Sequence, residues 1–261
     1  MKKKFLGLVL VGVLIIAVKF AYSVYLDHIL PVQTNKQSTV SKTSSSSNAS
    51  ESTDNASGDT LPTGVKLVAT GGGSYTVNGN KSTLNAKIKS APWAHFSAVD
   101  NLGRPGVANA WLNRSARIYK TRDQTGNSST IKPVGWHQAK INGTWVYNRG
   151  HLLGYAIIGG LKSVDASEAN RQNIITQTAW ANQSQSKNAD GQNYYEQIVR
   201  KALDQNKLVR YQVKPYYVGS DLVARGTFMQ AKSSDNSVDF NVYVPNVQPG
   251  VTINYRTGYV R

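Results

Sequence analysis

The pattern of apolar and polar positions divides the chain into three parts. Residues 5–18 are an unbroken run of apolar residues and glycine that follows three lysines. Residues 33–60 are rich in Ser, Thr and Asn and contain almost nothing large and apolar. Farther along, apolar residues recur at the spacings of helices and strands up to the C-terminus. We therefore expect a hydrophobic leader, a linker, and a folded region that begins between residues 62 and 80.

Within the folded region, the spacing of apolar residues predicts both helices and strands. An apolar stripe at helical spacing predicts an amphipathic helix over residues 192–206. The turn-like residues 103–106 precede a short predicted helix at residues 107–112. Alternating or apolar runs predict strands at residues 145–147, 173–176, 208–218 and 238–244. Because these elements do not alternate regularly, they indicate an α+β domain with an antiparallel sheet.

The leader indicates export. A basic end followed by a short apolar run is typical of a secretory signal. The run of 14 residues is shorter than the roughly 20 that span a membrane, but residues 20–26 can extend it. Small residues at Ala21-Tyr22-Ser23 offer a cleavage site. Cleavage and retention as an anchor both stay open, and both place the rest of the chain outside the cytoplasm.

These observations predict a domain organisation. Residues 1–30 are expected to be a signal peptide or signal anchor, and residues 31–65 a flexible linker too polar to bury a core. Residues 66–261 form the expected domain. The chain is then either held at the cytoplasmic membrane by residues 5–26 or secreted after cleavage.

Charge and cysteine content restrict the function. The formal net charge is +16 at pH 7, which favours polyanionic partners, either nucleic acid or an anionic membrane surface. The chain has no cysteine, so disulfides, thiol nucleophiles and cysteine-bound zinc are excluded. Export remains compatible with this composition.

A four-residue motif, Asn148-Arg149-Gly150-His151, offers candidate chemistry. Residues two apart in a strand share a face, so Arg149 and His151 should point the same way. Gly150 lets another group approach the backbone closely. Arginine can bind a phosphate while a neutral histidine accepts a proton from water. The motif suits phosphodiester hydrolysis, although a structural role for His151 remains an equal alternative.

Amide side chains follow downstream, in residues 177–183 (Gln-Thr-Ala-Trp-Ala-Asn-Gln). Hydrolysis of a phosphodiester usually requires a divalent metal, which stabilises charge on the phosphate. The scarcity of carboxylates argues against a two-metal site of Asp and Glu, but an amide oxygen can bind Mg²⁺. Considered alone, these amides are better explained as helix-surface or capping residues.

Several separated segments, in the same order, resemble the DNA/RNA non-specific endonucleases with a ββα-metal core, which are known for an Asp-Arg-Gly-His motif. The segments are residues 148–151, 173–177 and Asn182, supported by residues 100–110, 222–226 and 240–250. The similarity covers about residues 90–258 and is greatest to membrane-anchored or secreted bacterial nucleases of DNA uptake. It implies a ββα-metal core with a central antiparallel sheet flanked by helices and loops.

The resemblance also implies residue roles. His151 would be the general base, Arg149 would lie near the scissile phosphate or brace the site, and Asn182 would bind Mg²⁺, with Mn²⁺ able to substitute. Glu196 would orient waters around the metal through hydrogen bonds. The remaining roles are substrate contacts from Gln177, Gln183, Arg104 and Arg225, and structural support from Asn148 and Gly150.

Two features depart from the pattern of that family. Asn148 replaces the usual Asp, which keeps the hydrogen-bonding shape but not the charge. Residues 184–191 have the character of a loop insertion, so the position of Glu196 is less certain than that of Asn182. A Glu196–Arg200 pair at i, i+4 is a good structural explanation for this glutamate.

The predicted function is a Mg²⁺-dependent, sequence-non-specific endonuclease that hydrolyses DNA, and RNA as well, outside the cytoplasm. Contacts to phosphates carry no sequence information, which fits such a substrate range. Two alternatives stay open: a non-catalytic cell-surface receptor for nucleic acid, and a secreted toxin nuclease. Partnership with a DNA-uptake machinery, the preference between DNA and RNA, and the oligomeric state also stay open.

Overall fold

The structure, a computed structural model, describes residues 61–120 and 130–261. The predicted signal segment, residues 1–30, and most of the predicted linker, residues 31–65, lie outside the described residues. Within the described ranges no helix is both long and apolar enough to cross a membrane. The domain boundaries inferred from the sequence therefore stay predictions.

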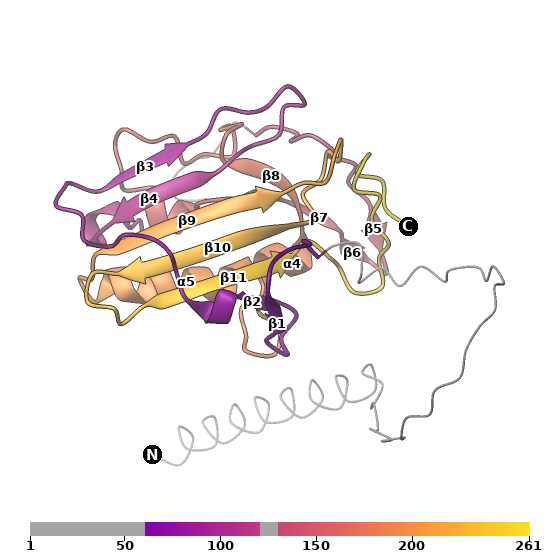
Figure 1. The fold of residues 1–261 in the computed structure, drawn as a ribbon. Helices are drawn as coiled ribbons and strands as arrows, with labels where there is room; N and C mark the ends of the chain where they lie inside the picture. Colours follow the sequence, from indigo (N-terminus) through magenta and orange to yellow (C-terminus); the bar gives the residue numbers. More distant parts are fainter. Residues whose placement is uncertain (1–60, 121–129) are drawn as a thin grey trace, which may run out of the picture. The chain divides into compact units, whose positions relative to one another are not determined.

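A seven-stranded antiparallel sheet is the main layer of the described domain (Figure 1). Its strand order is β1-β2-β11-β10-β9-β4-β3, so strands from both ends of the described chain meet in one sheet. The strands are β1 (Leu67–Ala69), β2 (Tyr75–Val77), β3 (Trp93–Phe96), β4 (Ala108–Leu112), β9 (Val209–Tyr216), β10 (Gly226–Ser233) and β11 (Asp239–Pro245). This arrangement confirms the α+β class with a central antiparallel sheet.

One face of this sheet is apolar. Strand β10 pairs with β9 and β11, which places Met229 opposite both Val213 and Val242. All three side chains are buried. Because side chains two residues apart in a strand point to the same face, their alternating neighbours extend the apolar surface along each strand. That surface has to be covered to be removed from water.

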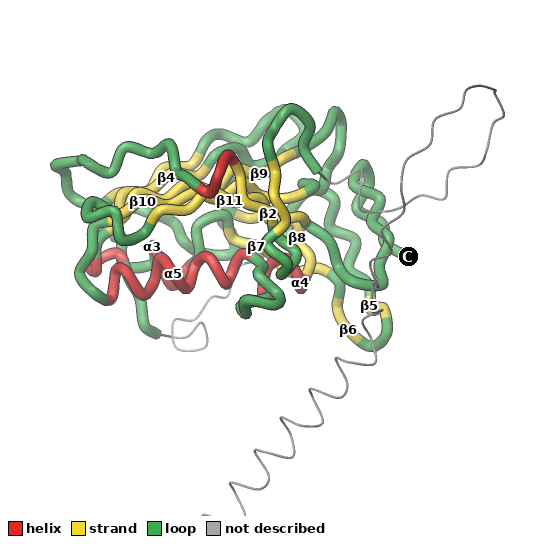
Figure 2. The backbone as a smooth tube through the Cα atoms, turned by 60° about the horizontal axis from the view of Figure 1, so that its bottom comes forward, coloured by secondary structure: helices red, strands yellow, loops and turns green. Residues whose placement is uncertain are grey.

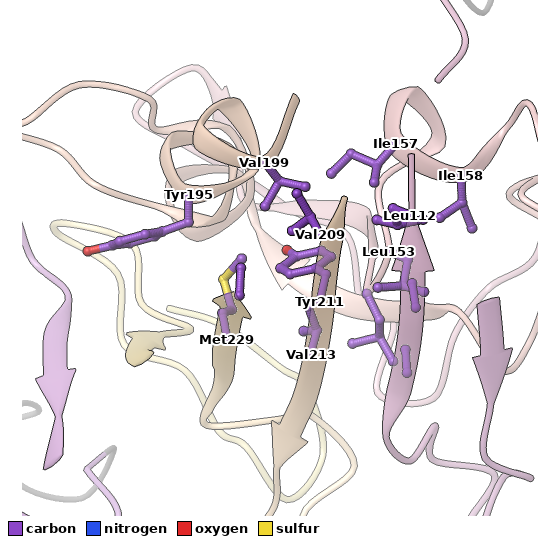
Figure 3. Packing of buried hydrophobic residues seen from close by; sticks show 14 of the residues in the cluster. Leu112, Leu153, Ile157, Ile158, Tyr195, Val199, Val209, Tyr211, Val213 and Met229 are labelled. Atoms are coloured by element: carbon purple, nitrogen blue, oxygen red, sulfur yellow. The ribbon is translucent and has the colours of Figure 1, made fainter. Parts of the chain in front are cut away.

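Helix α5 (Gln192–Asp204) covers the apolar face of the sheet (Figure 2). Figure 3 shows Val199 of this helix lying above Val209 and Tyr211 of β9. Fully burying side chains of this size stabilises the fold by about 1.5–3 kcal/mol each. The amphipathic helix that the sequence predicts over residues 192–206 is therefore confirmed, with its stripe packed against the sheet.

A second, two-stranded antiparallel sheet lies next to the helices. It consists of β7 (Tyr147–His151) and β8 (Ile174–Thr178), and β8 runs directly into helix α4 (Ala179–Gln183). Two strands followed by a helix are the ββα unit that the resemblance implies. The remaining short elements are η1 (Asn78–Asn80), η2 (Arg114–Ala116), β5 (Lys140–Ile141), β6 (Thr144–Trp145) and α3 (Tyr155–Ile158).

Asn246 joins the two-stranded sheet to the larger one. Its side-chain oxygen accepts a hydrogen bond from the backbone NH of Thr178, at 2.7 Å. Its side-chain nitrogen donates to the backbone carbonyls of Thr176 (3.1 Å) and Ala224 (2.9 Å). Because Asn246 is almost fully buried, these bonds satisfy groups that water cannot reach.

Two local predictions are corrected by the structure. The short helix predicted at residues 107–112 is wrong, because this segment is strand β4 between β3 and β9. Its alternate residues Ala108, Ala110 and Leu112 are all buried, so the segment has strand periodicity. Strand β10 was not predicted from the sequence at all.

The strand predicted at residues 145–147 is interrupted. The backbone of Val146 donates to Ala139 and accepts from Ala179, so strand pairing breaks there. Strand β7 then begins at Tyr147 and continues through the whole Asn-Arg-Gly-His motif. The motif is therefore part of the strand, which agrees with the prediction that Arg149 and His151 lie two apart on one strand.

Candidate active site

Strand pairing between β7 and β8 positions the motif. Arg149 lies opposite Thr176, and His151 lies opposite Ile174. Helix α4 follows β8 immediately, and the Thr178 hydroxyl caps it by accepting a hydrogen bond from the backbone NH of Ala181, at 3.0 Å. The short sheet thus carries the histidine on one strand and leads the amide-rich helix away from the other.

A cavity of about 330 Å³ brings several predicted residues together. His151 from β7, Asn182 and Gln183 from α4, and Glu196 from α5 all line it. The other lining residues are Lys120, Gly154, Tyr155, Ala156 and Asn193. Residues that lie far apart in the chain, from three different elements, therefore meet at one cavity.

The hydrogen bonding of His151 defines its tautomer. Its Nε2 atom lies 3.0 Å from the backbone carbonyl oxygen of Ala166. A carbonyl oxygen only accepts, so Nε2 carries the hydrogen of this bond. In the neutral imidazole, the basic lone pair is then on Nδ1. The side chain is almost fully buried, so this contact also fixes the orientation of the ring.

Three neighbours hold the Glu196 carboxylate in the wall of the cavity. Gln192 donates to its Oε1 at 2.9 Å, and Arg200 donates to its Oε2 at 3.2 Å. The backbone of Gly154 also hydrogen-bonds its carboxylate. Burial raises the pKa of Glu196, and the hydrogen bonds and the Arg200 charge oppose that shift. The i, i+4 pair with Arg200 therefore exists, and it coexists with a place in the cavity wall.

A chain of buried amides connects the two-stranded sheet to helix α5. Gln177 donates through Nε2 to the side-chain oxygen of Gln192, at 3.1 Å. Gln192 in turn donates to the backbone carbonyl of His151 as well as to Glu196. Gly150 makes room for this chain, since a Cβ atom there would lie 2.1 Å from Oε1 of Gln177.

Asn182 offers an oxygen to a hard cation. It is half-buried and lines the cavity, and within the described part of the chain its side chain makes no hydrogen bond. No cluster of three or more His, Cys, Asp or Glu side chains suited to a metal occurs among the described residues. A cation that uses few protein ligands and keeps several waters, as Mg²⁺ does, fits this donor set.

A second cavity, of about 570 Å³, shares Asn182 and Gln183 with the first. Arg149 lines it, with its guanidinium carbon 4.7 Å from the ring centroid of Trp136. Asn148 lines it as well, and its buried side-chain nitrogen has no hydrogen-bond partner among the residues that the structure describes. Arg149 and His151 are two apart on one strand, as predicted, but they line neighbouring cavities.

Three predicted substrate contacts lie away from both cavities. Gln177 is almost fully buried and belongs to the amide chain. Arg104 is paired with Asp100 at 2.7 Å and donates to two backbone carbonyls. Arg225 is paired with Asp221 at 2.7 Å and lines a larger cavity of about 790 Å³, and the described residues of that lining include no histidine. Of the four predicted substrate contacts, only Gln183 borders the candidate site.

Sequence reasoning missed Gln192, Asn193 and Lys120. Gln192 and Asn193 open helix α5, where they have the character of ordinary helix-start residues. Lys120 belongs to no regular element. Nothing in their local sequence marks them, because their place in the site depends on how the helix and the loop pack against β7.

This fold and site are those of a nuclease with a ββα core. The family model for DNA/RNA non-specific endonucleases matches residues 84–235. The chain belongs to the DNA/RNA non-specific endonuclease family. It is thus a hydrolase, a nuclease that acts on nucleic acid.

Solved structures agree with this assignment. The chain is similar to NucA from Streptococcus agalactiae with magnesium bound, at 41% identity and a TM-score of 0.71, over 76% of this chain and 90% of that one. The metal-free form of the same nuclease matches at a TM-score of 0.69, with the same identity and coverage. Sda1 nuclease with a bound zinc ion matches at 21% identity and a TM-score of 0.57, over 73% of this chain and 96% of that one. That last likeness supports the fold alone.

Proposed function

We propose that the chain is a Mg²⁺-dependent, sequence-non-specific endonuclease that hydrolyses DNA, and RNA as well, outside the cytoplasm. One observation supports this most: His151, with its Nε2 bonded to Ala166, borders the same cavity as Asn182 and Glu196. The magnesium in the similar NucA structure supports the choice of metal. The charge of +16 supports binding to a long polyanion.

His151 would act as the general base. Its Nδ1 would take a proton from water, the water oxygen would bond to phosphorus, and the bond from phosphorus to the 3′-oxygen would break. The leaving 3′-oxygen would take a proton from a water molecule, and His151 would return its own proton to solvent. The products would be a 5′-phosphate and a 3′-hydroxyl. The bond from Nε2 to Ala166 keeps the ring in the tautomer that this step requires.

Asn182 would hold the metal, and Glu196 would orient water around it. Bound Mg²⁺ would stabilise negative charge on the phosphate. Arg149 would brace this region from the neighbouring cavity, where its stacking on Trp136 holds the guanidinium in place. These groups contact phosphate and water, and neither carries sequence information.

A plasmid assay with the full chain tests this function. We expect nicking and linearisation of supercoiled plasmid in Mg²⁺, and none in excess EDTA. Replacing His151 by Ala should lower the rate by about 10²–10⁴-fold, which is the usual contribution of a general base. The control is His95→Ala, because His95 is exposed on β3 and stacks on Trp93.

Three outcomes would reject the proposal: full activity of the His151→Ala variant, full activity in EDTA, or plasmid that is bound but never cut. The last result would favour the receptor alternative. A parallel assay that follows the degradation of single-stranded RNA under the same conditions decides whether RNA is a substrate.

The extracytoplasmic location rests on the basic leader and the apolar run of residues 5–18. Protease treatment of intact cells should degrade the domain or release it from the cells, whereas a cytoplasmic control protein should survive. Protection of the domain in intact cells would contradict this part of the proposal.

A further inference from the structure

The hairpin β5–β6 presents a tryptophan at the rim of the second cavity. Trp145 is 52% exposed and lines that cavity together with Trp136 and Arg149. A single exposed apolar side chain is common on protein surfaces and needs no explanation by itself. Trp145 differs because it borders a cavity that shares Asn182 and Gln183 with the candidate active site.

The hairpin holds this tryptophan in a defined place. Lys140 and Trp145 are cross-strand partners, and the Lys140 ammonium lies 4.7 Å from the ring centroid. The turn consists of Asn142 and Gly143, with φ values of 50° and 77°. An Asn-Gly pair with both φ values positive is the preferred two-residue hairpin turn. Trp145 is thus a pre-organised side chain with a cation beside it.

The second cavity has the composition of a nucleotide subsite. Two tryptophans line it, and each has a cation over its ring: Lys140 on Trp145 and Arg149 on Trp136. Its volume of about 570 Å³ lies within the usual range for small-ligand sites. Among the described residues of its lining, Glu168 is the one acidic residue.

We infer that Trp145 is a stacking platform for an unpaired nucleobase of the substrate, next to the phosphate that is cleaved. This inference rests on the proposed function, since it places the base relative to the site of His151 and Asn182. In a duplex, neighbouring base pairs cover both faces of each base. The platform therefore requires single-stranded nucleic acid or a locally opened nucleotide. Stacking tolerates every base, so it is compatible with non-specific cleavage.

Binding in EDTA tests the platform without cleavage. The probes are a fluorescently labelled twelve-nucleotide oligothymidine and an abasic oligomer of equal length, which carries the same phosphates but no bases. Anisotropy with the full chain should show that Trp145→Leu weakens oligothymidine binding about tenfold, whereas Trp145→Phe stays within about threefold of wild type. Binding of the abasic oligomer should not change in either variant.

The matched control is Trp93→Leu. Trp93 also has a cation over its ring, the Arg210 guanidinium at 4.9 Å, but it lies on β3 and borders neither cavity. Unchanged oligothymidine binding by Trp145→Leu would overturn the inference, and so would an equal loss on both oligomers. Because no cleavage is measured, failure here is distinguishable from failure of the plasmid assay.

Discussion

The side-chain amide of Gln192 lies 2.9 Å from the carboxylate of Glu196 and also donates to the backbone carbonyl of His151. One buried amide on helix α5 thus supports both a carboxylate of the cavity and the strand that carries the histidine. Its own oxygen accepts from Gln177. Gln192 therefore positions the groups on which the proposed chemistry depends.

Replacing Gln192 by Leu should lower nuclease activity by about 10- to 100-fold, because residues that orient ligands and their waters typically matter by that factor. The variant also leaves buried partners unsatisfied, which should cost about 1–3 kcal/mol of stability. Plasmid cleavage and urea unfolding measure the two effects. Gln197→Leu is the control, since Gln197 lies on the same helix and, among the described residues, its side chain hydrogen-bonds only the exposed Gln185. Equal cleavage rates for Gln192→Leu and Gln197→Leu would contradict the positioning role of Gln192.

Asn182 should govern the response to metal. In wild type we expect Mg²⁺ to raise the melting temperature, because a ligand that binds only the folded state stabilises it. Asn182→Ala should lose most of this rise and need more Mg²⁺ for cleavage, whereas Asn182→Asp should keep it because an oxygen donor remains. Asn188→Ala, in the exposed loop after α4, serves as the control. A normal Mg²⁺ response in Asn182→Ala would show that the metal is held elsewhere.

Glu196 should make stability depend on pH in a defined direction. Burial raises its pKa in the folded chain above the usual 4.5, so the folded state binds this proton more tightly than the unfolded state. Its contribution to stability is greatest below about pH 4.5 and declines as pH rises through the raised pKa. The difference in melting temperature between wild type and Glu196→Gln should therefore fall as pH increases.

Asp235 should make stability depend on pH in the opposite direction. Hydrogen bonds from Ser233 and Ser237 lower the pKa of Asp235, so its contribution is lost as pH falls. The difference in melting temperature between wild type and Asp235→Asn should therefore grow with increasing pH. If the melting-temperature differences for Glu196→Gln and Asp235→Asn change in the same direction with pH, the direction assigned to the pKa of Glu196 is wrong.

Asn246 should be important for stability. Replacing it by Ala removes three buried hydrogen bonds to backbone groups of Thr176, Thr178 and Ala224. An unsatisfied buried partner costs about 1–3 kcal/mol, so we expect a loss of about 2–4 kcal/mol in urea unfolding. The exposed Asn188→Ala change should stay within about 0.5 kcal/mol. If Asn246→Ala lowers the free energy of unfolding by no more than about 0.5 kcal/mol, water or a neighbouring group must replace the three lost hydrogen bonds.

Sequence patterns predicted the elements whose signals are local. Helix α5 carries its stripe within one continuous segment, and strands β9 and β11 alternate along their own length. Strand β4 was missed because a segment of five residues is too short for periodicity to separate helix from strand. Its pairing with β3 and β9 decided the matter. The motif around His151 was visible because all four of its residues are adjacent.

By itself, the sequence determined the family, the basic character and the histidine, because each is a property of residues that are read in order along the chain. Only the tertiary structure decided that Arg149 borders a different cavity from His151, that Arg104 and Arg225 are paired with carboxylates outside the site, and that Gln192 joins Glu196 to the motif strand. The physical reason is that cavities, ion pairs and buried hydrogen bonds form between segments distant in sequence. Their partners are selected by how sheets and helices pack.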